Sequence, residues 1–404
     1  MWLLPYSDLT PDQQMAVELP IDTHKVIIGP PGSGKTQILI HRAAHIVNNF
    51  NLKEDEYKIF VFTNVVKDYI KSGINFLNLP ETVVSTFDHW CRIFYEKNIG
   101  PLFVVHDKSF FKRVRKKVLD FLKLNPSFQR RLSFVMVDEG QDLSPECYEI
   151  MLLIAKHITV FVDPKQKIFE GGASEEFIRN KLNLKSYSFY FLNGYRNSPN
   201  VAKLASYFIE DEKEREKYLN QVYAIDKIRE IPLLYISSDF EDEMENLAKI
   251  IRQRLILNER IGIIVPTKKI LKEIYENLKK RKIPVEKALA THLSHNTCDF
   301  NNSSPKISTF HSAKGLTFDA VLIPSLTEKA ISWIDERVRK NIFFVGISRA
   351  VKWVYISTLE EEEPEEFNLL KEAEKNGDLV IKRYDEDGIS FKMTEEDEDD
   401  FSVL

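Results

Sequence analysis

The sequence predicts an α/β protein with two tandem domains, each built on a parallel sheet. Short apolar, β-branched runs alternate with helical patterns along most of the 404 residues, which is typical of βα units. A glycine-rich loop lies directly between one such run and a helical stretch. We expect a first domain over residues 1–190, a second over 191–358, and an acidic, partly disordered tail over 359–404.

The expected strands form two series of short apolar runs, each bounded by turn residues or a helical pattern. The first series covers residues 26–28, 58–62, 83–85, 134–137 and 159–162. The second covers residues 188–192, 231–236, 262–265, 306–309, 320–323 and 353–357. The boundary between the two domains is therefore expected near residues 185–193.

A small helical insertion is expected in the first domain, at about residues 98–131. Within it, residues 109–124 place apolar side chains at helical spacing. The residues between them include a group of basic residues, Lys112, Arg113, Arg115, Lys116 and Lys117. The pattern predicts an amphipathic helix with a basic outer face.

Composition narrows the class of protein. Hydrophobic residues make up 43% and charged residues 29%, and the formal net charge of -5 includes the acidic tail. No apolar stretch approaches the length of about 18 residues that a membrane span needs. The cysteines, Cys91, Cys147 and Cys298, are too few and too scattered for a disulfide framework. These features argue against a membrane-spanning or disulfide-stapled protein and favour a cytoplasmic one.

The glycine-rich loop matches G-x-x-x-x-G-K-[ST] in full, with Gly29, Pro30, Pro31, Gly32, Ser33, Gly34, Lys35 and Thr36. A strand, a glycine loop and a helix N-terminus in this order direct backbone N–H groups and a positive dipole end at one spot, which suits a triphosphate. In such a loop the lysine binds the β- and γ-phosphates and the hydroxyl completes the coordination of Mg²⁺. The loop predicts nucleotide binding and hydrolysis.

Two adjacent carboxylates follow the apolar run at 134–137, where ligands of open α/β sheets collect. Asp138 is expected to hold Mg²⁺, and Glu139 to act as the general base toward the attacking water. A charged turn after a strand is the alternative, but the upstream phosphate loop favours the catalytic interpretation.

Further motifs occur in a fixed order around these two. They are Leu9 to Gln14, Val61 to Asn64, Ser85 to Phe87, Asp138 to Asp142, Val162 to Gln166, Asn193 to Ser198, Thr309 to Leu316 and Phe344 to Ala350. In this order they resemble the motifs of superfamily one helicases of the UvrD, Rep and PcrA type. The resemblance implies two RecA-like P-loop domains, with ATP and Mg²⁺ bound in the cleft between them.

The resemblance also assigns residues to the nucleotide. It implies that Gln13 reads the adenine, that Tyr195 stacks on it, and that Gly315 lies at the nucleotide. Gln166 would contact the γ-phosphate. Arg196 and Arg349 would reach across from the second domain as arginine fingers, so that hydrolysis requires closure of the two domains.

The resemblance also implies a second set of residues, which would contact nucleic acid: Phe62, Asn64, Thr86, Phe87, Phe169 and His311. Aromatic stacking on bases, together with amide and hydroxyl contacts to phosphates, is the usual chemistry of sequence-independent binding to single strands. Either phenylalanine, Phe62 or Phe87, can equally be a core residue. Single-stranded DNA is the expected partner, and RNA remains an open alternative.

Three departures from the family pattern bear on function. First, only Glu286 to Pro305 stand where the family inserts a large accessory domain. Second, the segment after Gln166 keeps an aromatic residue, Phe169, but lacks the tryptophan that stacks on a base in the family. Thr317 stands where the family has a glutamate near the sugar. We therefore expect a nucleic-acid-stimulated ATPase and translocase that unwinds duplex poorly on its own.

Two alternatives stay open. The reduced architecture also fits a regulatory ATPase that controls a partner, such as a nuclease in DNA repair or phage defence. Separately, His292, His295 and Cys298 have a spacing close to that of zinc ligands, although the polar residues around them favour a flexible loop.

Overall fold

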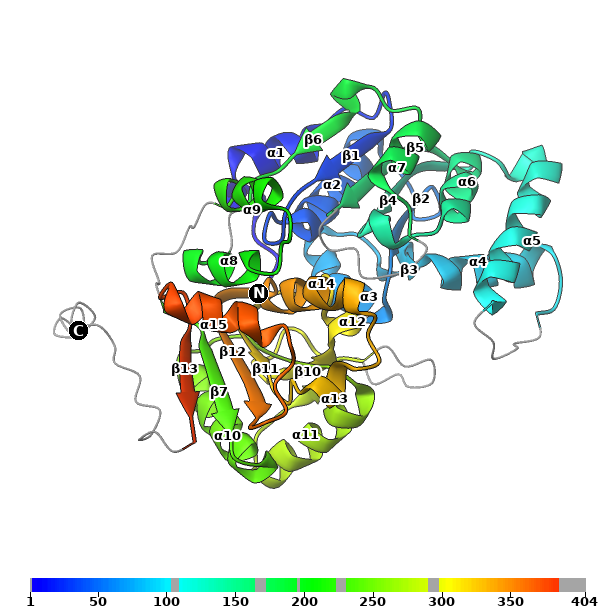
Figure 1. Cartoon of the computed structure of the whole chain (residues 1–404). Coiled ribbons are helices and arrows are strands. Elements are labelled where there is room, and N and C mark those ends of the chain that lie inside the picture. The colour runs from blue at the N-terminus through cyan, green and yellow to red at the C-terminus, as the bar shows by residue number, and fades with distance from the viewer. Residues whose placement is uncertain are drawn as a thin grey trace.

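Two parallel sheets organise the chain, one in each domain (Figure 1). The structure is a computed structural model that describes residues 2–102, 109–163, 172–194, 197–222, 230–289 and 298–384. All the strand pairs found within these ranges are parallel, which confirms the predicted α/β fold class.

The first sheet has six strands in the order β3-β2-β4-β5-β1-β6. Their bounds are β3 (Val84–Thr86), β2 (Tyr57–Val61), β4 (Leu132–Val137), β5 (Ala155–Val162), β1 (Lys25–Ile28) and β6 (Phe189–Phe191). The phosphate loop follows β1 and the acidic pair follows β4, and both strands flank β5. Because parallel strands end at the same edge, this order brings the two motifs together.

Helices connect these strands in the first domain. They are α1 (Pro11–Glu18), α2 (Lys35–Phe50), α3 (Asn64–Ile74), α4 (Phe87–Asn98), α5 (Phe110–Leu124), α6 (Pro145–Ile154) and α7 (Glu175–Lys181). The predicted amphipathic helix is α5, whose apolar face buries Phe110, Val114, Val118 and Leu122. Together with part of α4 it projects from the side of the domain (Figure 1).

The second sheet has seven strands in the order β13-β7-β12-β11-β8-β10-β9. Their bounds are β13 (Val380–Arg383), β7 (Leu233–Ser237), β12 (Ala350–Leu359), β11 (Phe318–Ile323), β8 (Ile261–Val265), β10 (Lys306–Thr309) and β9 (Glu286–Lys287). The helices of this half are α8 (Pro199–Ser206), α9 (Glu212–Asn220), α10 (Phe240–Ile256), α11 (Lys268–Lys280), α12 (Phe310–Ala313), α13 (Glu328–Ile331), α14 (Glu336–Ile347) and α15 (Phe367–Lys375).

Two sequence predictions about organisation are wrong. The run at 188–192 was expected in the second sheet, but β6 pairs with β1 in the first. Residues from 359 were expected in an acidic tail, but α15 and β13 belong to the second domain, where β13 pairs with β7. The acidic side chains of α15 obscured its apolar face, which buries Phe367, Leu370 and Ala373.

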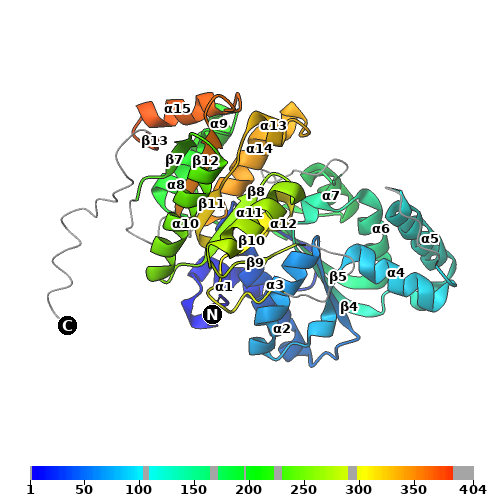
Figure 2. The same cartoon turned by 90° about the horizontal axis from the view of Figure 1, so that it is seen from below.

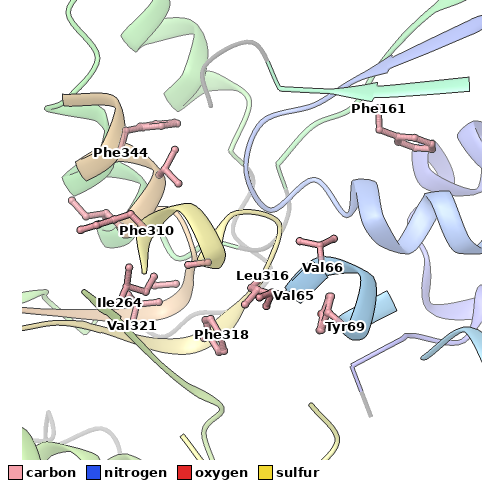
Figure 3. Packing of buried hydrophobic residues seen from close by; sticks show 14 of the residues in the cluster. Val65, Val66, Tyr69, Phe161, Ile264, Phe310, Leu316, Phe318, Val321 and Phe344 are labelled. Carbon is pink, nitrogen blue, oxygen red and sulfur yellow. The ribbon is translucent and has the colours of Figure 1, made fainter. Parts of the chain in front are cut away.

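The two domains share an apolar core. One continuous cluster of buried residues includes Ile27 and Ile38 of the first domain and Leu234 and Phe344 of the second. Figure 3 shows part of it at the domain boundary, where Val65, Val66 and Tyr69 of α3 lie next to Leu316. The ring centroids of Tyr69 and Phe300 are 5.2 Å apart. The described structure therefore holds the two domains in close contact.

No helix in the described ranges combines the length and the apolar character that crossing a bilayer requires. The three cysteines carry free thiols; Cys91 and Cys147 are buried, and Cys298 is partly buried.

Candidate nucleotide site

The phosphate loop is shaped by left-handed glycines. Gly34, the N-cap of α2, has a φ of 82°, and a Cβ there would lie 2.6 Å from Nε2 of Gln13. The hydroxyl of Ser33 is buried and has no hydrogen-bond partner among the described residues. An N-terminal helix end with an unsatisfied buried hydroxyl beside it fits a phosphate group.

Lys35 folds back onto its own loop. Its Nζ donates to the carbonyls of Gly29 at 2.7 Å and Pro30 at 3.1 Å, and lies 3.4 Å from Oδ2 of Asp163. The side chain is almost fully buried. The ammonium thus lies at the mouth of the loop, where a phosphate would replace neutral carbonyl partners with a charged one.

The two expected magnesium ligands are neighbours. Oγ1 of Thr36 donates to Oδ2 of Asp138 across 3.3 Å, although the residues lie on different elements. Burial and the adjacent Glu139 raise the pKa of Asp138 to about 7. Two hard oxygen ligands side by side fit Mg²⁺, and a cation between them would favour the ionised carboxylate.

Glu139 is held by its neighbours in a strained backbone conformation. Its φ is 52°, which is uncommon for a residue with a Cβ, and its Oε2 accepts a hydrogen bond of 2.5 Å from Nε2 of Gln141. Burial alone would raise the pKa of this carboxyl, but the positive charges of Lys314, Lys35 and Arg349 outweigh it and lower the pKa. Glu139 is therefore ionised at neutral pH.

Gln141 joins the acidic strand end to the neighbouring strand. While its Nε2 donates to Glu139, its Oε1 accepts from the backbone N–H of Asp163 at 3.1 Å. Both ends of the amide are thus engaged, which fixes the orientation of the Glu139 carboxylate.

The second domain contributes cations to the same site. Nζ of Lys314, which follows α12, lies 2.6 Å from Oδ2 of Asp142 and 3.9 Å from Oε2 of Glu139. Arg349 is buried, and its Nε donates to the carbonyl of Val345 at 3.0 Å. Burial lowers the pKa of this guanidinium, against the opposing charges of Glu139 and Asp163.

A cleft between the domains brings these groups together. The space between its walls measures about 430 Å³, a volume that includes part of the open solvent. Residues of both domains line it: Trp2, Pro31, Gly32, Gly34, Lys35, Thr36, Gln37, Tyr69, Glu139, Gly315, Thr317 and Arg349. The expected residues Lys35, Thr36, Glu139, Gly315 and Arg349 therefore share one cavity.

Gln13 lies against the phosphate loop, with both ends of its amide engaged. Nε2 donates to the carbonyl of Ser33 at 3.0 Å, and Oε1 accepts from the backbone of Thr10 at 3.0 Å. Recognition of adenine by Gln13 stays a prediction.

Several expected site residues lie outside the described residues. These are Gln166, Phe169, Tyr195 and Arg196, together with His292 and His295 of the zinc hypothesis. Among the residues that the structure does describe, no group of three or more histidine, cysteine or acidic side chains could hold a metal ion.

The residues expected at nucleic acid differ in exposure. Phe62 lines a small cavity together with Lys314, and His311 is half-buried. The half-buried Thr86 caps α4 through a bond from the backbone of His89, and Oδ1 of Asn64 accepts from Lys67. Phe87 is 2% exposed and packs edge-on against Phe60, so its ring has no exposed face to offer a base.

Gln141 and Lys314 were not singled out from the sequence. Each lies inside a motif that carries the resemblance, between or beside residues with assigned roles. In the sequence, Gln141 stands two positions after Glu139, and Lys314 stands directly before Gly315. These positions could have drawn attention to both residues, but their contacts depend on how the strands and the domains meet.

The parallel sheet, the phosphate loop and the acidic end of a nearby strand define the P-loop class of α/β proteins. The family described as "UvrD/REP helicase N-terminal domain" matches residues 9–117 and 111–183, and "UvrD-like helicase C-terminal domain" matches residues 286–361. The chain belongs to the UvrD/Rep-type helicases.

Two proteins with similar sequences are named as probable DNA helicases. A "Probable DNA helicase" of Mycoplasma pneumoniae is 24% identical over 279 residues, which is 62% of this chain and 49% of that protein. A "Probable DNA helicase II homolog" of Mycoplasma capricolum is 30% identical over 120 residues, or 28% of this chain and 17% of that protein. The chain thus spans less than half the length of these relatives.

One solved structure, the C-terminal domain of a possible DNA helicase from Lactobacillus plantarum, is 15% identical and has a TM-score of 0.35. The match covers 46% of this chain and 98% of that chain. The strand order and the parallel pairing define the fold of this chain.

Proposed function

We propose that the chain is an ATP-dependent translocase or helicase that acts on single-stranded DNA and hydrolyses ATP when its two domains close. This proposal rests on the ion pairs that Lys314 of the second domain forms with Asp142 and Glu139 of the first. A catalytic carboxylate held by a cation from another domain makes the chemistry depend on how the domains meet.

The roles of the phosphate-loop residues follow from their positions. Lys35 would bind the β- and γ-phosphates, and Thr36 and Asp138 would hold Mg²⁺, which supplies charge neutralisation to phosphoryl transfer. Glu139, ionised and oriented by Gln141, would accept a hydrogen bond from a water and take its proton.

The second domain would supply the positive charge that the developing anion needs. Arg349 shares the cleft with Lys35 and Glu139, and its guanidinium is fixed by backbone carbonyls. A preoriented cation of this kind stabilises charge on the transferring phosphoryl group. Arg196 is proposed as a second finger.

Single-stranded DNA is the proposed polymer because proteins similar to this chain are named as DNA helicases. The proposed contacts lie on both domains, with Phe62 and Asn64 on the first and His311 on the second. A strand bound across both domains would favour the closed arrangement and so raise the rate of hydrolysis.

The test is the rate of ATP hydrolysis measured alone, with single-stranded DNA and with single-stranded RNA, followed by a strand-displacement assay. We expect DNA to raise the turnover number severalfold and displacement to be weak. Equal rates with and without both polymers would contradict the proposal. No contact among the described residues favours the alternative of a regulatory ATPase that controls a partner nuclease.

A further inference from the structure

An exposed tryptophan marks the second domain near the domain boundary. Trp333 lies between α13 and α14 and is 55% exposed, whereas Trp2 and Trp353 are 6% and 0% exposed. Its indole Nε1 donates to the carbonyl of Ala330 at 2.9 Å. This bond satisfies the indole N–H of a large aromatic ring that is accessible to solvent, and tryptophan is enriched at binding interfaces.

The ring lies beside His311. The two ring centroids are 6.0 Å apart and the planes differ by 33°. His311 belongs to α12, which begins directly after β10, and α12 and α14 lie at the boundary with the first domain (Figures 1 and 2). Burial, and then the charge of Lys314, lower the pKa of His311, which keeps the imidazole neutral at neutral pH. Two adjacent rings without charge suit stacking.

Positive charge gathers at the same edge of the sheet. β8 pairs with β10 so that Val265 is opposite Thr309, and α11 and α12 each begin just after these strands. The first turn of α11 carries the exposed Lys268 and Lys269 and no acidic residue. Cations at a helix N-terminus oppose the helix dipole, so they cost stability there and favour an anionic ligand.

We propose that Trp333 and His311 form a base-stacking platform for single-stranded DNA on the second domain, with Lys268 and Lys269 contacting its phosphates. This inference rests on the proposed function: to His311, which the family motifs already imply at nucleic acid, it adds Trp333, Lys268 and Lys269, which lie outside the motifs given above. Stacked bases on aromatic rings, flanked by lysine contacts to the backbone, form the common chemistry of sequence-tolerant binding to single strands.

The platform also has a short physical path to the catalytic site. His311 and Lys314 are three positions apart at one turn of α12, and Lys314 pairs with Asp142 and Glu139. A base that orders His311 would therefore restrain the segment that carries Lys314. We expect occupation of the platform to contribute to the stimulation of hydrolysis.

The test compares the wild type with Trp333→Ala and Trp333→Phe. Binding of a labelled oligothymidylate is followed by fluorescence anisotropy, together with an abasic strand of equal length that keeps the phosphates and lacks the bases. We expect Trp333→Ala to weaken oligothymidylate binding by about 10-fold or more, and Trp333→Phe to recover part of the loss. Binding of the abasic strand should be the same in all three proteins.

Phe50→Ala is the matched control, because Phe50 is a 56% exposed aromatic residue at the end of α2, remote from α12. Circular dichroism and the thermal midpoint show whether each variant is folded. If the wild type binds oligothymidylate and Trp333→Ala binds it equally well, the platform is wrong and the proposed function stands. If the wild type binds no single strand, the proposed function itself fails.

The DNA concentration for half-maximal stimulation of hydrolysis gives a second readout. We expect this concentration to rise in Trp333→Ala in proportion to the lost affinity. An unchanged value would overturn the platform, as would an equal loss of affinity for the abasic strand, which would indicate a disturbed surface and no stacking.

Discussion

At the residue scale, Glu139 combines a left-handed backbone with a buried, ionised carboxylate. Backbone strain of this kind persists only where the surroundings fix it, and it clusters at functional sites. Here the surroundings are Gln141, which donates to the carboxylate, and the backbone N–H of Glu139, which donates to Asp138 at 3.1 Å. In this conformation the two adjacent carboxylates have different partners: Glu139 accepts from Gln141, and Asp138 accepts from the backbone N–H of Glu139.

Replacing the carboxylate of Glu139 by an amide tests its role as base. We expect Glu139→Gln to lower the rate of ATP hydrolysis by about 100-fold or more, because the amide cannot accept a proton from water. ATP binding, followed with a fluorescent analogue, should remain. The control is Glu149→Gln, which removes a carboxylate that pairs with Lys181 at the surface. Retained hydrolysis in Glu139→Gln would refute the assignment.

Lys314 and Asp142 form a pair in which both side chains are almost fully buried, at 2% and 0% exposure. We expect Lys314→Met to lower the free energy of unfolding by about 3–5 kcal/mol, because it removes one partner of a buried ion pair. Adding Asp142→Asn should restore part of the loss, since the buried negative charge is then removed as well. Urea denaturation measures both.

The matched control for this pair is Lys340→Met, which breaks the solvent-exposed contact with Glu210 and should change stability little. If the costs of Lys314→Met and Asp142→Asn simply add, the two side chains do not interact as the structure indicates.

At the element scale, the strands beside strong motifs were the most predictable. The strand before the phosphate loop and the strand before the acidic pair are fixed by β-branched runs next to recognisable loops, and the structure confirms both as β1 and β4. The helix at 109–124 was equally clear, because its apolar residues recur at helical spacing.

The elements that sequence assigned wrongly lack such local signals. β6 is only three residues long, and nothing in its sequence says which sheet it joins. α15 and β13 lie among acidic residues, which made the segment look like a solvated tail. The apolar residues of α15 are few, and only the folded structure shows that Phe367, Leu370 and Ala373 are buried.

The folded state of α15 gives a prediction of its own. Leu370 is 0% exposed, so we expect Leu370→Ala to lower the free energy of unfolding by about 2–5 kcal/mol, the usual cost of removing a large buried side chain. Lys371→Ala, at a neighbouring exposed position, should have little effect. Equal stabilities in urea denaturation would mean that α15 does not pack as described.

At the scale of the whole molecule, the sequence predicted two domains around one nucleotide site but not the contacts between them. Asp142 and Lys314 are 172 positions apart, and neither periodicity nor spacing shows that they pair. The same holds for Val66 of α3 and Gly315, which meet at the domain boundary. Contacts of this kind depend on how the two sheets dock against each other.

Gly315 provides a test of that docking. Its φ is +81°, and a Cβ there would lie 2.9 Å from Cγ2 of Val66 in the other domain. Valine cannot move this atom cheaply, because it is branched at Cβ. We expect Gly315→Ala to push the domains apart and to lower the rate of ATP hydrolysis by about 10-fold or more, since the second-domain cations would then be misplaced.

Gly377 is the matched control for this change, because it has a φ of +75° and nothing within 4 Å of the added Cβ. Gly377→Ala should therefore carry the backbone strain without changing hydrolysis. Adding Val66→Ala to Gly315→Ala should restore part of the rate by removing the clash. If it restores nothing, while Gly377→Ala is fully active, Gly315 acts on the nucleotide alone and the contact between the domains does not control catalysis.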